Sequence, residues 1–138
     1  MKGIMRRMTE KKFMLPNRKA FEVMISYIPY FKNPKNEFYE IKVTDYFYSK
    51  KIIKFIDDFY KNKFDYPFDW TKWTDNFWEL SNNKESFDNA DIETVIMFLS
   101  TIINADRFIE GTMAFAIDNG HILAILEKFR KHTMNIKE

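Results

Sequence analysis

Apolar residues in the first half of the chain recur at the spacing of one helix face. The positions concerned are Phe21, Met24, Ile25 and Ile28. They follow Asn17, whose side chain suits a helix N-cap, so the pattern predicts a helix from that point. Pro29 lacks the amide hydrogen that a helix interior needs, and we therefore expect the helix to end or kink near residues 30 and 31.

The next segment alternates with a period of two residues. Tyr39, Ile41 and Val43 fall on one side and Glu40, Lys42 and Thr44 on the other, which predicts a half-buried strand over residues 37–42. One strand does not make a sheet. It has to pair with a short neighbour such as residues 45–48, lie as an extended loop, or pair across a dimer. We favour an extended loop or a minimal hairpin.

Two further helices are predicted in the middle of the chain. Ser49 suits the N-cap of a helix that runs to about Lys63. The side of this helix expected to be buried carries Ile52, Ile53, Ile56, Phe59 and Tyr60. The side expected to face solvent carries Lys50, Lys54, Asp57, Asp58 and Lys61. After Pro67, Asp69 is placed to cap a third helix, and residues 82–86 form a polar connection. The apolar side of this third helix is Trp70, Trp73, Phe77 and Leu80.

The C-terminal part contains the most apolar helix. It is expected to open at Asp88 or Asn89, and its apolar positions cover several sides, so we expect it to be the central helix. These positions are Ile92, Val95, Ile96, Met97, Phe98, Leu99, Ile102 and Ile103. A short helix follows Gly111 and ends where Gly120 takes the left-handed conformation, and a last helix carries Ile122, Ile125, Leu126 and Phe129.

These patterns together predict a mainly α protein, a bundle of five or six helices with at most a short strand or hairpin near residues 37–48. Residues 1–16 are polar and methionine-rich and are expected to form a flexible N-terminal arm. Residues 17–138 are then a single helical domain, the usual size for one hydrophobic core.

Composition narrows the classes of function. The chain has no cysteine and two histidines, which excludes thiolate nucleophiles and sulfur-ligated zinc, and we expect neither a metal site nor a cofactor. Its fifteen phenylalanines, seven tyrosines and three tryptophans must supply much of the core. No secretion signal or membrane-spanning run is recognised, so we expect a cytoplasmic location.

Charge is unevenly distributed along the chain. Residues 1–60 have a net charge of +6 and residues 61–138 a net charge of −4, which lets the halves attract each other or steers an anionic partner to the first half. Nucleic-acid association therefore remains an alternative. It would use Arg6, Arg7, Lys11, Lys12, Arg18 and Lys19.

Three charged residues near the end of the central helix are the first candidate site. Helical spacing brings Arg107 near Glu110 and Asp106 near Glu110, so one guanidinium could serve both carboxylates. We favour a structural role in which this cluster fixes the helix junction beside Gly111. In the alternative, Arg107 holds an anionic substrate and one carboxylate acts as a base in a small-ligand protein or enzyme.

The ring-rich stretch around the third helix is the second candidate. Trp70, Trp73 and Trp78 could stack on a base, a sugar or a peptide ring, with Tyr66, Phe68 and Phe77 nearby. Local acidic residues argue against nucleic acid here. Rings at helical spacing more often pack in a core, so core packing and a partly exposed binding surface both remain open.

The C-terminal pattern resembles a known family. Asp106, Arg107, Phe108, Glu110 and Gly111, followed by Gly120, Ile122, Ile125 and Leu126, look like the motif of small bacterial and phage-associated proteins catalogued as a domain of unknown function. The step from Asp69 to Trp73 is similar to a second part of that pattern, whereas Asn104 stands where members often have arginine. The resemblance implies a helical domain and no particular reaction.

The sequence thus favours a non-catalytic binding or interaction module, with a protein partner or a second copy of the chain as its partner. A small-ligand protein or enzyme and a nucleic-acid accessory protein remain alternatives.

Overall fold

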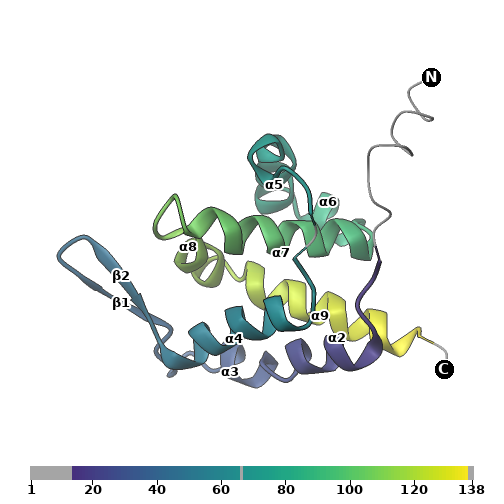
Figure 1. Cartoon of the computed structure of the whole chain (residues 1–138), viewed down its shortest axis with the longest axis horizontal. Helices are drawn as coiled ribbons and strands as arrows, with labels where there is room; N and C mark the ends of the chain where they lie inside the picture. The colour runs from purple at the N-terminus through teal and green to yellow at the C-terminus, as the bar shows by residue number, and fades with distance from the viewer. Residues whose placement is uncertain (1–13, 66, 137–138) are drawn as a thin grey trace.

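A computed structural model describes residues 14–65 and 67–136. Almost all of the arm expected at residues 1–16 therefore lies outside the described residues. The rest forms a mainly α fold with one small antiparallel hairpin, as the sequence predicted (Figure 1).

The N-terminal helix is broken earlier than expected. α2 (Arg18–Ile25) is capped by the Asn17 side chain, which accepts a hydrogen bond from the amide of Ala20, and α3 (Ile28–Lys32) follows after two residues. In a continuous helix, the residue at position 29 would donate its amide hydrogen to the carbonyl of Ile25. Pro29 has no amide hydrogen, so α2 ends at Ile25 rather than near residue 30.

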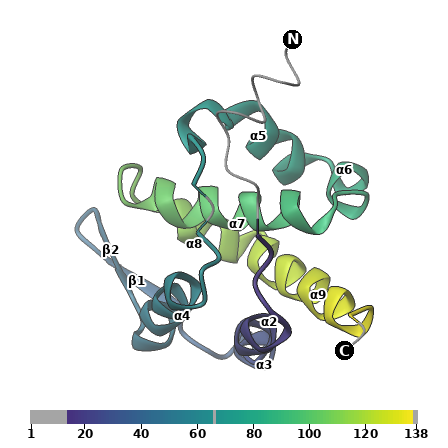
Figure 2. The ribbon, with the colours of Figure 1, turned by 45° about the vertical axis from the view of Figure 1, so that its right-hand side comes forward.

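The alternating segment forms a two-stranded hairpin. β1 (Tyr39–Lys42) pairs with β2 (Asp45–Tyr48), with Ile41 opposite Tyr46 and Lys42 opposite Asp45. The expectation that Ile41 and Val43 are half-buried is wrong, since they are 52% and 97% exposed. The hairpin projects from the helices in both views (Figures 1 and 2).

α4 (Lys50–Lys61) starts at the expected cap, because the Ser49 hydroxyl accepts from the amide of Ile52. Three of its positions differ from the expectation. Phe55, which was not part of the expected buried stripe, is fully buried. Ile53 is 58% exposed, whereas Asp58 is buried and accepts from the Tyr27 hydroxyl at 2.6 Å and from Lys54 at 3.1 Å. A buried carboxylate with these two donors is stable there, which an apolar pattern alone does not reveal.

The segment of residues 69–91 contains more helix than expected. Asp69 caps only a short 3-10 helix, η1 (Trp70–Lys72), and α5 (Thr74–Asn82) begins separately. Residues 82–86, expected as a connection, contribute to α6 (Lys84–Asp88), which is capped by Asn83. Consequently the N-cap of α7 (Ile92–Asp106) is Asp91, not Asp88 or Asn89.

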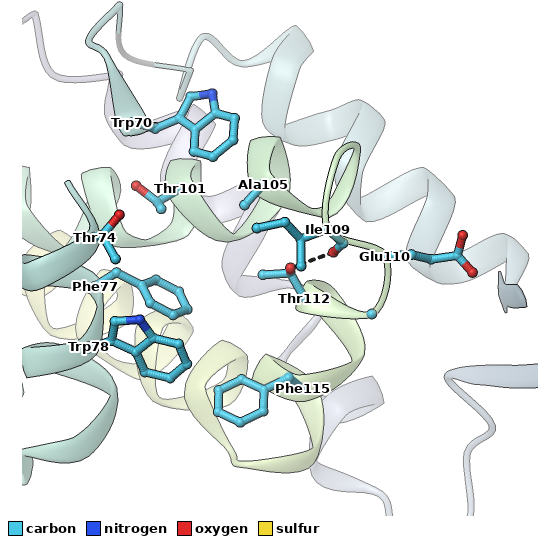
Figure 3. A pocket seen from close by; sticks show the side chains of 11 residues that line it. Trp70, Thr74, Phe77, Trp78, Thr101, Ala105, Ile109, Glu110, Thr112 and Phe115 are labelled. Carbon is cyan, nitrogen blue, oxygen red and sulfur yellow. Dashed lines mark hydrogen bonds between the residues drawn. The ribbon is translucent and has the colours of Figure 1, made fainter. Parts of the chain in front are cut away.

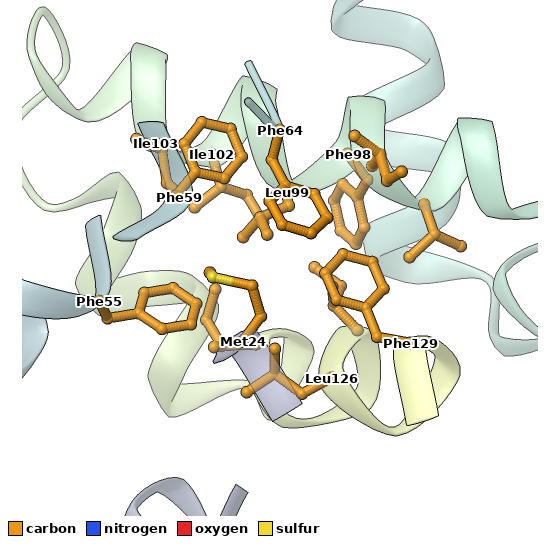
Figure 4. Packing of buried hydrophobic residues seen from close by; sticks show 14 of the residues in the cluster. Met24, Phe55, Phe59, Phe64, Phe98, Leu99, Ile102, Ile103, Leu126 and Phe129 are labelled. Carbon is orange, nitrogen blue, oxygen red and sulfur yellow. The ribbon is translucent and has the colours of Figure 1, made fainter. Parts of the chain in front are cut away.

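α7 is the central helix, as predicted. It packs against η1, α5, α8 (Thr112–Asp118) and α9 (His121–Met134), and Gly120 takes the expected left-handed conformation between the last two. The core is ring-rich (Figure 4). Fully buried side chains from four helices and one loop meet there, among them Met24, Phe55, Phe59, Phe64, Phe98, Leu99, Ile102, Leu126 and Phe129.

Candidate functional site

A pocket of about 290 Å³ opens between η1, α5 and the junction of α7 with α8. Most of its lining is apolar, and these side chains come from four elements and the junction itself (Figure 3). The apolar lining residues are Trp70, Phe77, Trp78, Ala105, Ile109 and Phe115. Both regions that the sequence singled out therefore contribute to one cavity.

Ring contacts form the walls of this pocket. Trp70 stacks on Phe108 with ring centroids 5.7 Å apart, and Trp78 contacts Phe115 edge-on at 6.1 Å. Phe77 supports Trp78 from the buried side at 5.0 Å. These pairs hold large apolar surfaces in place at the mouth of the pocket.

The apolar surface extends beyond the pocket mouth. Trp78 is 47% exposed, Phe108 is 75% exposed, and Ile109 and Phe115 are also exposed. Contiguous exposed apolar side chains of this kind mark interaction surfaces in soluble proteins. We call Trp70, Trp78, Phe108, Ile109 and Phe115 the aromatic rim.

Of the three tryptophans predicted to form a binding surface, Trp73 has a different environment. It packs edge-on against Phe68 at 6.0 Å and against the core, and it is not part of the pocket lining. Tyr66, which was considered with them, lies outside the described residues. Trp70 and Trp78 therefore line the pocket, whereas Trp73 packs against the core.

The three threonine hydroxyls of the lining already donate to backbone carbonyls, that of Thr74 to the carbonyl of Thr71. The hydroxyl of Thr101 donates to the carbonyl of Met97, and that of Thr112 donates to the carbonyl of Ile109 at 2.6 Å. The Glu110 side chain points away from the cavity (Figure 3). An occupant therefore meets apolar surface and no free charge.

The carboxylates of the charged cluster hold the hairpin. Asp106 accepts from the Tyr48 hydroxyl at 2.8 Å and from the amide of Met113 at 2.9 Å. Glu110 accepts from the amide of Tyr46 at 2.7 Å. Burial, together with the hydrogen bond to Asp106, raises the pKa of the Tyr48 phenol well above its usual value.

Gly111 completes this attachment. Its φ of +96° is a left-handed conformation that favours glycine, and a Cβ at this position would lie 2.9 Å from the ring of Tyr46. A third tyrosine, Tyr39, donates to Asp118 at 2.6 Å, which raises the pKa of that phenol to about 12. Tyr46 and Tyr48 of the hairpin thus contact three motif residues, Asp106, Glu110 and Gly111.

Arg107 does not pair with these carboxylates, so the expectation that its guanidinium serves both of them is wrong. The described residues provide no ion pair for Arg107, and its exposed guanidinium lies 5.5 Å from the ring centroid of Tyr60. The Tyr60 hydroxyl donates to Asn104 at 2.7 Å. Asp106 and Glu110 instead accept hydrogen bonds from Tyr48 and from the amide of Tyr46 on the hairpin.

Sequence reasoning missed the three tyrosines and Phe115. Tyr39, Tyr46 and Tyr48 occupy one face of the hairpin through the pairing of β1 with β2. The signal available in the sequence was the alternation along the two strands, which puts the phenols on one face of the hairpin and Glu40, Lys42 and Asp45 on the other. The partners of the phenols, however, are 58 to 79 residues away.

The remaining expectations concern metals, membranes and nucleic acid. Among residues 14–65 and 67–136, no group of three histidine, aspartate or glutamate side chains suits a metal ion, and no helix could cross a bilayer. Of the basic residues proposed for nucleic acid, Arg6, Arg7, Lys11 and Lys12 lie outside the described residues. Arg18 and Lys19 belong to α2, where Arg18 pairs with Glu22 at 3.4 Å.

Comparison with known proteins identifies a family. The model of a family of unknown function, DUF6508, matches residues 16–135. Searches of curated proteins and of solved structures found no significant match.

Proposed function

The chain belongs to the family of unknown function DUF6508, and for this member we propose a non-catalytic binding role in which the pocket receives an uncharged ring or branched aliphatic side chain of a partner protein. The observation that carries the proposal is the pocket with its aromatic rim. The family description names no activity, so the proposal depends on the chemistry of the pocket.

The pocket suits a side chain in both size and polarity. Its volume of about 290 Å³ is at the small end of ligand pockets, enough for one ring system. Its hydroxyls are used internally and its one carboxylate faces the hairpin, so a charged occupant would lose hydration without gaining a partner.

The exposed rim favours a protein partner over an isolated small molecule. Phe108 lies on the surface outside the cavity, and Ile109, which lines the cavity, is still 63% exposed, so a small occupant would leave much of both side chains in water. A partner surface that inserts one side chain could cover both the pocket and these neighbours. Aromatic anchors in pockets surrounded by apolar contacts are the usual energetic centre of such interfaces.

A competing enzymatic role has less support. It required Asp106, Arg107 and Glu110 to line one site, whereas only Glu110 is among the pocket residues. A nucleic-acid role has no further support among the described residues. We retain a bacterial origin and a cytoplasmic location as parts of the proposal.

Indole, as a stand-in for a tryptophan side chain, tests the proposal. Binding of indole to the full chain is measured by ligand-detected NMR, and we expect Trp78→Ala to weaken it at least tenfold because one wall of the pocket is removed. Phe47→Ala is the matched control, since Phe47 on the hairpin is 49% exposed and lies outside the pocket. Equal loss in both variants, or no saturable binding by the wild type, would refute the proposal.

A further inference from the structure

The two edges of the hairpin differ in their protection. The outward amide of Tyr46 on β2 donates to Glu110, so the β2 edge is closed by a carboxylate of the α7–α8 junction. The bond from the Ser49 amide to the carbonyl of Phe38 sets the alternation of the antiparallel ladder, in which Ile41 and Tyr46 form a non-hydrogen-bonded pair. The amide and carbonyl of Ile41 therefore point outward from β1.

No described residue covers the β1 edge at this point. Among residues 14–65 and 67–136, neither the amide nor the carbonyl of Ile41 has a hydrogen-bond partner outside the strands. The edge lies on the side of the hairpin opposite to Glu110, and the hairpin projects from the helices (Figures 1 and 2). An exposed strand edge of this kind can pair with another strand.

Charge along β1 is complementary to a second β1 in one register. We infer that β1 pairs antiparallel with β1 of a second copy of this chain, about a two-fold axis at Ile41. In this register Glu40 lies opposite Lys42 of the other copy, and Lys42 lies opposite its Glu40. The adjacent registers, centred on residue 40 or 42, would instead place identical charges opposite each other.

The same register also provides hydrogen-bond partners for the outward amide and carbonyl of Ile41. The Ile41 amide of each copy donates to the Ile41 carbonyl of the other, which gives two reciprocal hydrogen bonds at the axis. Glu40 and Lys42 already lie within 3.5 Å of each other along the strand and are both largely exposed, so they are free to turn toward the second copy.

The contact is small, because β1 has four residues. We therefore expect a weak dimer in rapid exchange rather than a permanent one. This inference is independent of the pocket, since neither strand contributes to the pocket lining.

Charge exchange tests the pairing. Sedimentation equilibrium on the full chain, over about 10 μM to 1 mM, is expected to show a concentration-dependent dimer. Glu40→Lys and Lys42→Glu should each weaken association about tenfold, because each change makes both cross-strand pairs like-charged. The double variant Glu40→Lys/Lys42→Glu should restore the wild-type constant.

A mixture of the two single variants gives the sharpest outcome. The lysine introduced at position 40 would then face the glutamate introduced at position 42, so the mixture should dimerise about as strongly as the wild type, although each variant alone associates about tenfold more weakly. Lys50→Glu, an exposed change of equal charge on α4, is the control and should leave association unchanged. Circular dichroism confirms that each variant is folded.

A wild-type chain that stays monomeric at about 1 mM overturns the inference that β1 pairs with β1 of a second copy. It is equally overturned if the double variant and the mixture associate no better than the single variants.

Discussion

Removing the Asp106 carboxylate should weaken the attachment of the hairpin to the α7–α8 junction. In Asp106→Ala the hydroxyl of Tyr48 and the amide of Met113, both partly buried, lose their shared acceptor. A hydrogen bond to a charged group contributes roughly 1.5–3 kcal/mol, so two such bonds, partly compensated by water, give a loss of about 3 kcal/mol. For a domain of this length that loss lowers the melting midpoint by about 10 °C.

The assay is urea unfolding of the wild type, Asp106→Ala, Tyr48→Phe and the double variant. We expect Tyr48→Phe to lose about 1.5 kcal/mol and the pair to show a coupling energy of about 1 kcal/mol, because both changes remove the same hydrogen bond. The more exposed pair of Tyr39 and Asp118 provides the control, and Tyr39→Phe should lose less than about 1 kcal/mol.

A loss below about 0.5 kcal/mol for Asp106→Ala, or strictly additive effects of the two changes, would refute this reasoning. The carboxylate would then not connect the hairpin to the helices in solution.

Three further predictions concern the same region and the last helix. Gly111→Ala should cost about 2 kcal/mol in urea unfolding, because the left-handed backbone is strained and the added Cβ meets the ring of Tyr46, whereas Gly120→Ala, with open space around it, should cost about 1 kcal/mol. Arg107→Ala should change the unfolding free energy by less than about 1 kcal/mol, since its guanidinium is exposed over one ring, and a melting midpoint lower by several degrees would restore the buried-cluster hypothesis. Burial lowers the pKa of His121 below 6.5, so protonation of His121 favours the unfolded chain, and stability should fall as the pH drops from 6.5 through the folded-state pKa. The urea midpoints measured at pH 7.5 and at pH 5.5 should therefore differ less in His121→Gln than in the wild type. An unchanged difference would exclude this histidine as the cause.

Local signals predicted most elements of the fold. Asn17 and Ser49 cap helices where their side chains indicated, and Gly120 takes its left-handed conformation. These features depend on residues within three or four positions of each other, so a linear pattern contains them. The break of the first helix at Ile25 was also contained in the sequence, through the carbonyl that Pro29 leaves without a donor.

Features set by contacts distant in sequence were not predictable in the same way. Asp58 looked like a surface residue because helical spacing puts it among the charged positions of its helix. The hydroxyl of Tyr27, from the turn between α2 and α3, nevertheless stabilises it in a buried position. Residues 82–86 looked like a connection because they are polar. Asn83 nevertheless caps a short helix there, and Phe87 packs against the core.

The candidate site shows the same division. Spacing alone placed Arg107 beside Glu110, because helical geometry was extended through a segment where the helix has already ended at Asp106. The actual donors to the carboxylates, Tyr46 and Tyr48, come from the hairpin. Ring spacing along the chain did not distinguish Trp70 and Trp78, which line the pocket, from Trp73, which packs against the core, because only the tertiary fold separates them.

The three tryptophans allow the most direct test of the binding pocket. Their indole Nε1–H resonances can be followed in ¹⁵N-labelled full-length protein, assigned by single Trp→Phe variants, during titration with unlabelled indole. The account predicts saturable shifts for Trp70 and Trp78, which line the cavity, and an unmoved resonance for Trp73, which packs elsewhere. Shifts of equal size at all three tryptophans, or none at Trp70 and Trp78, would contradict it.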